Sequence, residues 1–148
     1  MIFFVLIVAA TLLYTLFDVF ASRSSGKIDP NMGAAIFNGL GAILPMFLYL
    51  YYKSFRSGMI TQTTSEGLWY ASGAGVSIAI FSILLIKIFE RGGLAYVVPL
   101  IYGGTVILAP LLGWLFFKEH ISPLQLAGIC VIAIGIGMVV VSQLQTHS

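Results

Sequence analysis

Charged side chains are scarce in this sequence. Only 8% of its 148 residues are Asp, Glu, Lys or Arg, whereas 59% are hydrophobic; soluble domains carry about 25% charged residues. So few charges cannot cover the surface of a water-soluble globule, and so apolar a chain is not disordered either. The net charge is only +2, and the basic residues do not cluster, so we expect no nucleic-acid partner.

Cysteine and histidine are also rare, with one Cys and two His in the chain. The lone Cys130 lies in an apolar run, and we interpret it as a small hydrophobic side chain. No group of His, Cys, Asp and Glu residues has the spacing of a metal site, and no nucleophile or phosphate-binding motif is present. The sequence therefore predicts no enzyme activity, no metal and no cofactor.

Five long apolar runs make up most of the chain. About 20 helical residues cross a bilayer, and each run reaches that length: residues 2–21, 33–52, 68–88, 94–117 and 123–142. Because hydrocarbon offers the backbone no hydrogen-bond partner, a span must be a helix or part of a closed barrel. The runs are continuously apolar rather than alternating, which favours helices. We predict an all-α integral membrane protein, a bundle of five transmembrane helices in one domain.

Residues that favour helix ends stand between these runs. Asp29 and Ser122 each precede a proline, which predicts an N-cap followed by a proline in the first helical turn. Thr63 and Glu66 have the spacing of a capping box ahead of the third run. Gly92-Gly93 predicts the end of the third helix and a tight turn into the fourth.

The basic residues are shared almost evenly between the two sides of the predicted bundle. Three are expected on the side of the N-terminus (Lys53, Arg56, Lys118) and four on the other (Arg23, Lys27, Lys87, Arg91). The positive-inside rule therefore leaves two alternatives: other factors fix one orientation, or molecules insert both ways up, which is dual topology.

The first run lacks a basic segment before it, so we expect it to remain as a helix rather than to be cleaved as a signal peptide. The short loops and the lack of a targeting segment lead us to expect a prokaryotic inner membrane.

Polar groups inside the apolar runs are the candidates for a functional site. Asp18 is ionisable and lies near the end of the first run; such groups in membrane helices often mark proton or ion pathways. It is either an interfacial residue that pairs with Arg23 or Lys27, or a carboxylate facing a cavity shared with Tyr14, one turn earlier. Asn38, near the middle of the second run, needs a partner from another helix or from a substrate.

The fourth run combines prolines with polar side chains. Pro99 removes a backbone hydrogen bond and predicts a kink, and broken helices commonly line transport sites. The alternative is a kinked helix with a packing role and tyrosines near the interface. The polar side chains of this stretch complete the candidates for a substrate or proton pathway: Tyr96, Tyr102 and Thr105.

Small residues recur at intervals of four within the runs, as in Ala71 and Gly75 or Ala133 and Gly137. In lipid, such rows let helix backbones approach closely. They predict tight packing, either within one chain or between two.

The stretch 93–141 resembles the last two helices of an EamA-type repeat of the drug/metabolite transporter superfamily. The similar elements include Ala95-Tyr96, Lys118-Glu119 at the end of the fourth run, and Ser122–Gln125. The number of helices and the length match one such repeat. The resemblance implies a small membrane transporter of organic solutes that works by alternating access.

Larger relatives carry two five-helix repeats of opposite orientation, with a site between them. A chain with one repeat therefore implies a dimer, either an antiparallel homodimer or a pair with another small membrane protein. The chain also resembles the four-helix small multidrug resistance proteins, which work as such dimers. It has one helix more than they have, and Tyr14 stands where they carry an essential glutamate, with Asp18 one turn later.

Two other functions stay open from the sequence. The first is a non-transporting membrane subunit that stabilises a larger complex. The second is an intramembrane enzyme, which needs more polar residues at one depth than Asp18, Tyr14 and Asn38.

Overall fold

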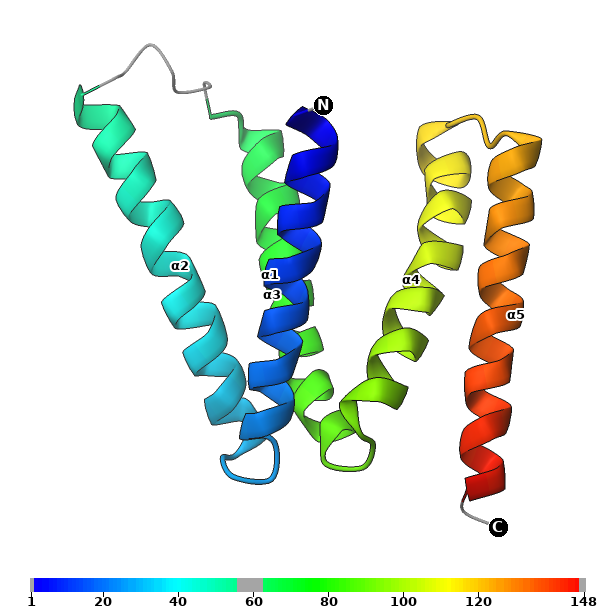
Figure 1. Cartoon of the computed structure of the whole chain (residues 1–148). Helices are drawn as coiled ribbons and strands as arrows, with labels where there is room; N and C mark the ends of the chain where they lie inside the picture. The colour runs from blue at the N-terminus through cyan, green and yellow to red at the C-terminus, as the bar shows by residue number, and fades with distance from the viewer. Residues whose placement is uncertain (1, 56–62, 147–148) are drawn as a thin grey trace. The chain divides into compact units, whose positions relative to one another are not determined.

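The computed structural model describes residues 2–55 and 63–146, and these residues form five α-helices and no strand (Figure 1). The helices are α1 (Ile2–Ser24), α2 (Pro30–Phe55), α3 (Ser65–Phe89), α4 (Leu94–Phe117) and α5 (Pro123–Thr146). All five are long and apolar enough to cross a membrane. The predicted fold class, all-α with five transmembrane helices, is therefore confirmed.

Each helix contains its predicted span, and all but α4 extend beyond it. The prediction ended each span where the apolar run stops, but helical hydrogen bonds continue into the polar interfacial layer of a bilayer. The extension matters most in α1, which ends at Ser24. Asp18 is therefore about 9 Å from the end of its helix, at about 1.5 Å per residue, whereas the predicted span placed it nearer the end. Arg56 lies outside the described residues.

Two helices begin as the sequence predicts. The Oδ1 of Asp29 accepts hydrogen bonds from the backbone N–H groups of Asn31 and Met32, at 2.9 and 3.2 Å, and caps α2. The Oγ of Ser122 accepts one from the backbone N–H of Gln125 at 3.2 Å, ahead of α5. Both side chains satisfy N–H groups that a helix start leaves without a partner.

The predicted start of α3 is wrong by one residue. Thr64, not Thr63, is the N-cap, and its Oγ1 accepts a hydrogen bond from the backbone N–H of Gly67 at 3.1 Å. Two threonines in succession give the same pattern in two registers, and the helix uses the later one. Gly93 then forms the N-cap of α4, in the turn where the sequence placed it.

The chain forms two compact units, which are described separately. One is Phe20–Arg91, which holds the end of α1 with α2 and α3. The other combines Met1–Val19 with Gly92–Ser148, and so holds most of α1 with α4 and α5.

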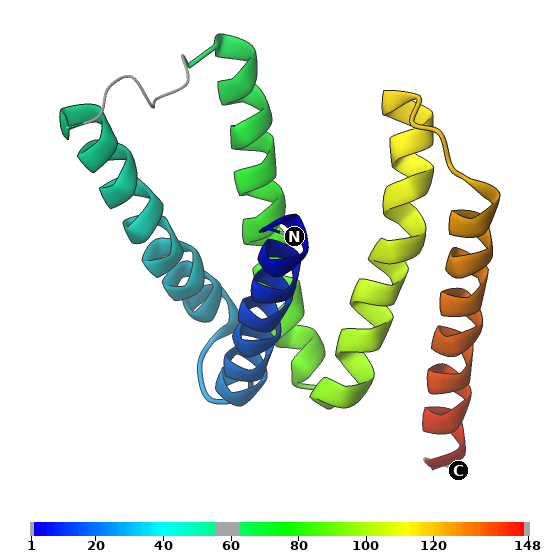
Figure 2. The same cartoon turned by 45° about the horizontal axis from the view of Figure 1, so that its top comes forward.

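In the unit Phe20–Arg91, α2 and α3 meet near the loop that opens α2 and spread apart toward their other ends (Figures 1 and 2). A Cβ at Gly33 would lie 2.6 Å from Ile86 Cδ1, so the Ile86 side chain packs directly over this glycine. The Oγ of Ser25 donates a hydrogen bond to the carbonyl of Ile86 at 2.9 Å. Farther along, the Nδ2 of Asn38 donates to the Oγ of Ser82 at 3.3 Å.

In the other unit, α4 and α5 run side by side in opposite directions (Figures 1 and 2). Gly103 allows their close approach, because a Cβ there would lie 2.7 Å from Ile136 Cγ1 and nearer still to Cδ1. At the adjacent Gly104, no described atom of the unit lies within 4 Å of such a Cβ. After α4, Lys118 adopts a left-handed conformation with φ of 55° and closes the helix.

Most serine and threonine hydroxyls of the described helices are bonded within their own helix. Each of these donates to a backbone carbonyl three or four residues earlier: Thr11, Thr15, Ser24, Ser72, Ser77, Ser82, Thr105 and Ser142. A polar group without a partner in hydrocarbon is costly, and this local bonding satisfies the hydroxyl proton without a second helix.

Candidate functional site

A pocket of about 460 Å³ lies along α1 and α4 in the unit that contains both. Its polar lining comes from α1 (Thr11, Tyr14, Thr15 and Asp18) and from Tyr102 of α4, and Ala10 and Val98 are the apolar lining residues. Pockets for small organic ligands measure about 300–1,000 Å³. The pocket therefore has the size for a small solute.

The carboxyl group of Asp18 is the acidic side chain of this pocket. Its side chain is buried, with only 1% of the residue exposed. The hydroxyl of Tyr102 donates a hydrogen bond to Asp18 Oδ1 at 2.8 Å. The partner is thus a hydroxyl from α4, where the alternative interpretation expected Arg23 or Lys27. A hydrogen bond to an ionised acceptor is about twice as strong as a neutral one, and it offsets part of the cost of burying the group.

Tyr14 fixes the position of Tyr102. Their ring centroids lie 5.2 Å apart at an interplanar angle of 77°, an edge-to-face arrangement that is favourable between aromatic rings. Tyr102 therefore contacts Tyr14 through its ring and Asp18 through its hydroxyl, and these two residues lie on the same face of α1.

Two lining residues were not predicted. Thr11 and Thr15 precede Asp18 by seven and three residues, which places all three on one face of a helix. Their Oγ1 atoms donate to the carbonyls of Ile7 and Thr11, at 2.9 and 2.8 Å. The helical spacing from Asp18 was the available signal for this polar stripe.

Asn38 lies in the unit Phe20–Arg91. Its Nδ2 donates to the carbonyl of Ala34 at 2.7 Å and to the Oγ of Ser82 at 3.3 Å. Of the two partners that the sequence left open, the structure gives it another helix.

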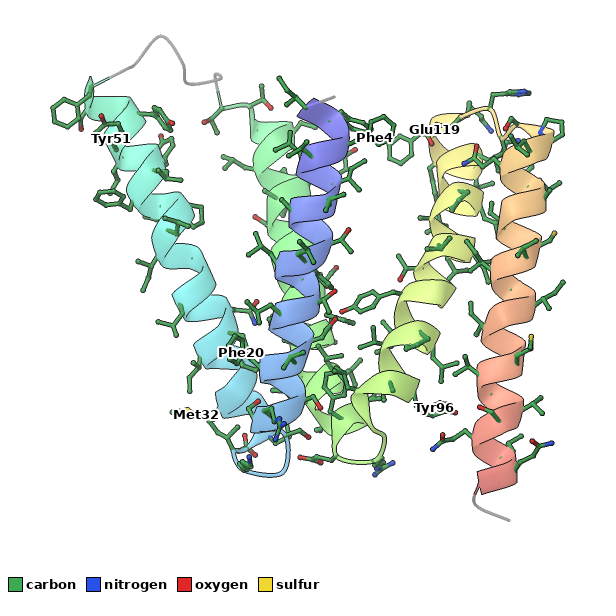
Figure 3. The ribbon with its side chains drawn as sticks, viewed as in Figure 1. Phe4, Phe20, Met32, Tyr51, Tyr96 and Glu119 are labelled. Atoms are coloured by element: carbon green, nitrogen blue, oxygen red, sulfur yellow. The ribbon has the colours of Figure 1, made fainter. Side chains whose placement is uncertain are left out.

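The remaining candidates in α4 do not line the pocket. The Oγ1 of Thr105 donates to the carbonyl of Ile101 in its own helix at 3.0 Å. Tyr96 lies near the start of α4 (Figure 3), and at 3.6 residues per turn it points about 120° away from Tyr102 around the helix. Pro99 lies inside α4, which continues as one helix to Phe117.

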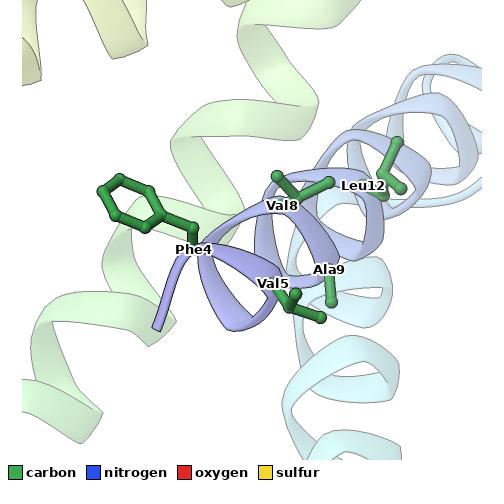
Figure 4. Close-up of a pocket in the computed structure, with 5 residues that line it drawn as sticks. All are labelled: Phe4, Val5, Val8, Ala9 and Leu12. Atoms are coloured by element: carbon green, nitrogen blue, oxygen red, sulfur yellow. The ribbon is translucent and has the colours of Figure 1, made fainter. Parts of the chain in front are cut away.

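A second pocket, of about 370 Å³, lies on the first half of α1 (Figure 4). All its lining residues are apolar: Phe4, Val5, Val8, Ala9 and Leu12. It has no polar side chain with which to orient a solute, so it is a poorer candidate than the pocket at Asp18. Within residues 2–55 and 63–146, no group of three or more His, Cys, Asp or Glu side chains could hold a metal ion.

Five apolar helices that can span a bilayer, with a buried carboxylate at a pocket of solute size, define an integral membrane protein with a candidate solute site. Residues 1–141 match the EamA-like transporter family, and the chain belongs to this family. It is also similar to an uncharacterized protein, MJ1333.1, of Methanocaldococcus jannaschii. The two are 35% identical over 107 residues, which cover 72% of this chain and 74% of the relative. No solved structure matches the chain at a significant level.

Proposed function

We propose that this protein moves small organic solutes across the membrane by alternating access, with the solute bound at Asp18. The observation that carries the proposal is the buried Asp18 carboxylate at the wall of the pocket, held by Tyr102 at 2.8 Å. Ionisable groups inside membrane helices are costly and usually functional. Membership in a transporter family supports the same conclusion.

The proposed role of Asp18 is to bind a proton or the cationic group of a solute. Tyr102 occupies Oδ1, so Oδ2 is the oxygen that a ligand would meet. The rings of Tyr14 and Tyr102 would add aromatic faces, which attract cations. A proton and a solute that compete for one carboxylate would couple their movements.

We further propose that the transporter is a dimer, with an antiparallel homodimer as the preferred form. The chain supplies one five-helix repeat, and its basic residues are shared almost evenly between the two sides. Rows of small residues offer surfaces for a second chain. At Gly75 of α3 and Gly137 of α5, an added Cβ would meet no described atom of its own unit within 4 Å.

The function is tested with the full chain in proteoliposomes, incubated with a ¹³C-labelled extract of small metabolites. Mass spectrometry of the vesicle contents should show solutes that accumulate above the level in empty vesicles. Asp18→Asn should reduce that accumulation at least tenfold and change its pH dependence. Ser77→Ala, which removes a hydroxyl bonded within α3, is the control and should leave accumulation unchanged.

Two outcomes would contradict the proposal. Contents equal to those of empty vesicles would favour the non-transporting subunit. An unchanged rate and pH dependence in Asp18→Asn would remove Asp18 from the transport step. The other titratable side chains of the pocket are Tyr14 and Tyr102, and their replacement by Phe would show whether they account for any pH dependence that remains.

The dimer is tested by the orientation of the two chain ends in intact cells. Cysteines placed near either end, in a Cys130→Ala background, are labelled with a reagent that does not cross the membrane. An antiparallel homodimer requires each end on both faces in comparable amounts. One orientation for nearly all molecules would contradict it and direct the search to a parallel dimer or an inverted partner protein.

A further inference from the structure

We propose that the pocket at Asp18 selects solutes with a protonated primary amine, over quaternary ammonium ions and over anions. This inference rests on the proposed function, since it names the class of solute that the same pocket takes. It follows from the hydrogen-bonding groups that remain available on the pocket wall.

The protons of three lining hydroxyls are already committed. Thr11 and Thr15 donate theirs to backbone carbonyls of α1, and Tyr102 donates its proton to Asp18. A hydroxyl has one proton and two acceptor lone pairs. The oxygens of these three residues can therefore only accept a further hydrogen bond.

The charges of the lining residues also favour a cationic solute. Asp18 carries the one carboxyl group among the lining residues, and none of them is Lys, Arg or His. Ala10 and Val98 are apolar, and the hydroxyl of Tyr14 interacts with that of Tyr102. An anion would meet a carboxylate and almost no donors, and burial without partners is costly for a charged group.

A primary ammonium group matches this set of acceptors. In this proposal its three N–H donors bond to the Oδ2 of Asp18 and the Oγ1 of Thr15, since both residues line the pocket and lie three residues apart on one face of α1. A quaternary ammonium ion keeps the attraction to the carboxylate and to the tyrosine rings, but it has no N–H to donate. Sites built to hydrogen-bond a ligand reject the analogue that lacks the group, because their own polar atoms stay unpaired.

The experiment measures binding to the purified full chain in detergent by isothermal titration calorimetry. The probes share one phenyl tail: 2-phenylethylammonium, its N,N,N-trimethyl analogue, and 3-phenylpropionate. The primary ammonium should bind at least tenfold more tightly than the trimethyl ion, and the anion should not bind. Thr15→Val should weaken binding of the primary ammonium severalfold without changing that of the trimethyl ion. Ser77→Ala should change neither.

Equal or tighter binding of the trimethyl ion, binding of the anion, or no binding of the primary ammonium would overturn the inference. So would an equal loss for both cations in Thr15→Val. Uptake of the same probes into proteoliposomes separates this inference from the proposed function. Selective binding without uptake would support the selectivity and contradict transport. Asp18-dependent uptake of the trimethyl ion or the anion would support transport and contradict the selectivity.

Discussion

The close approach of α4 to α5 should make two adjacent glycines respond in opposite ways to the same substitution. A methyl group at Gly103 would lie 2.7 Å from Ile136 Cγ1, whereas at Gly104 it would meet no described atom of the unit within 4 Å. Gly103→Ala should therefore destabilise the protein, and Gly104→Ala should not.

The magnitude follows from two contributions. Alanine in place of glycine inside a helix gains about 1 kcal/mol of helix propensity, and this gain is common to both positions. Only Gly103→Ala adds the cost of overpacking, which is typically about 1–3 kcal/mol. Gly104→Ala should thus be more stable than Gly103→Ala by about 1–3 kcal/mol.

The assay is unfolding of the full chain in mixed micelles with increasing sodium dodecyl sulfate, followed by circular dichroism. Ile136→Val removes the Cδ1 atom that the new methyl would press against. In the double variant, Gly103→Ala should cost less than it does alone, so that a double-mutant cycle gives a favourable coupling of about 1 kcal/mol.

Equal stability of Gly103→Ala and Gly104→Ala would refute this account of the α4–α5 contact. Additive effects of Gly103→Ala and Ile136→Val would also refute it, because the two side chains would then not touch.

Three further predictions concern helix ends, and each is checked by the same unfolding assay. Thr64→Ala should lower the stability by about 1 kcal/mol through loss of the N-cap, while Thr63→Ala should be near neutral. A larger loss in Thr63→Ala than in Thr64→Ala would instead support Thr63 as the N-cap. Lys118→Gly should stabilise by about 1 kcal/mol, because φ of 55° is strained for lysine and not for glycine; a loss of stability would contradict that. Hydrogen bonds from the backbone N–H groups of Met32 and Asn31 hold the pKa of Asp29 below its ordinary 3.8. The Asp29 carboxylate should therefore stabilise the folded protein above about pH 4, and this contribution should fade at lower pH. Asp29→Ala should lower the stability and remove the loss of stability that acid causes.

The fold was predictable because its cause is spread over many residues. Each apolar run is long enough for a bilayer, and hydrocarbon leaves the backbone little choice but a helix. The exact start of α3 was not predictable, since Thr63 and Thr64 are chemically alike and only the helix register separates them. The caps at Asp29 and Ser122 had no such competitor, and both predictions hold.

Tyr14, Asp18 and Tyr102 were all candidates from the sequence, but the contact between two helices that joins them could not be predicted. Tyr14 and Asp18 share a face of α1 by their spacing, but nothing local in the sequence couples Asp18 to Tyr102, which lies 84 residues later. Their contact depends on how α1 and α4 pack. Thr15 was not predicted as a lining residue, because threonines that bond to their own helix are common in apolar helices.

The separation of Asp18 from Tyr102 has a consequence for biosynthesis. Hydroxyls that bond within their own helix allow that helix to leave the translocon for lipid as soon as it is made. Asp18 differs, because its hydrogen-bond partner belongs to α4, and α2 and α3 must be synthesised first. Until α4 emerges, α1 carries a carboxyl group without the Tyr102 hydroxyl, and an acid without a partner is costly to insert into lipid. The stable insertion of α1 thus depends on α4, which is synthesised after two further helices.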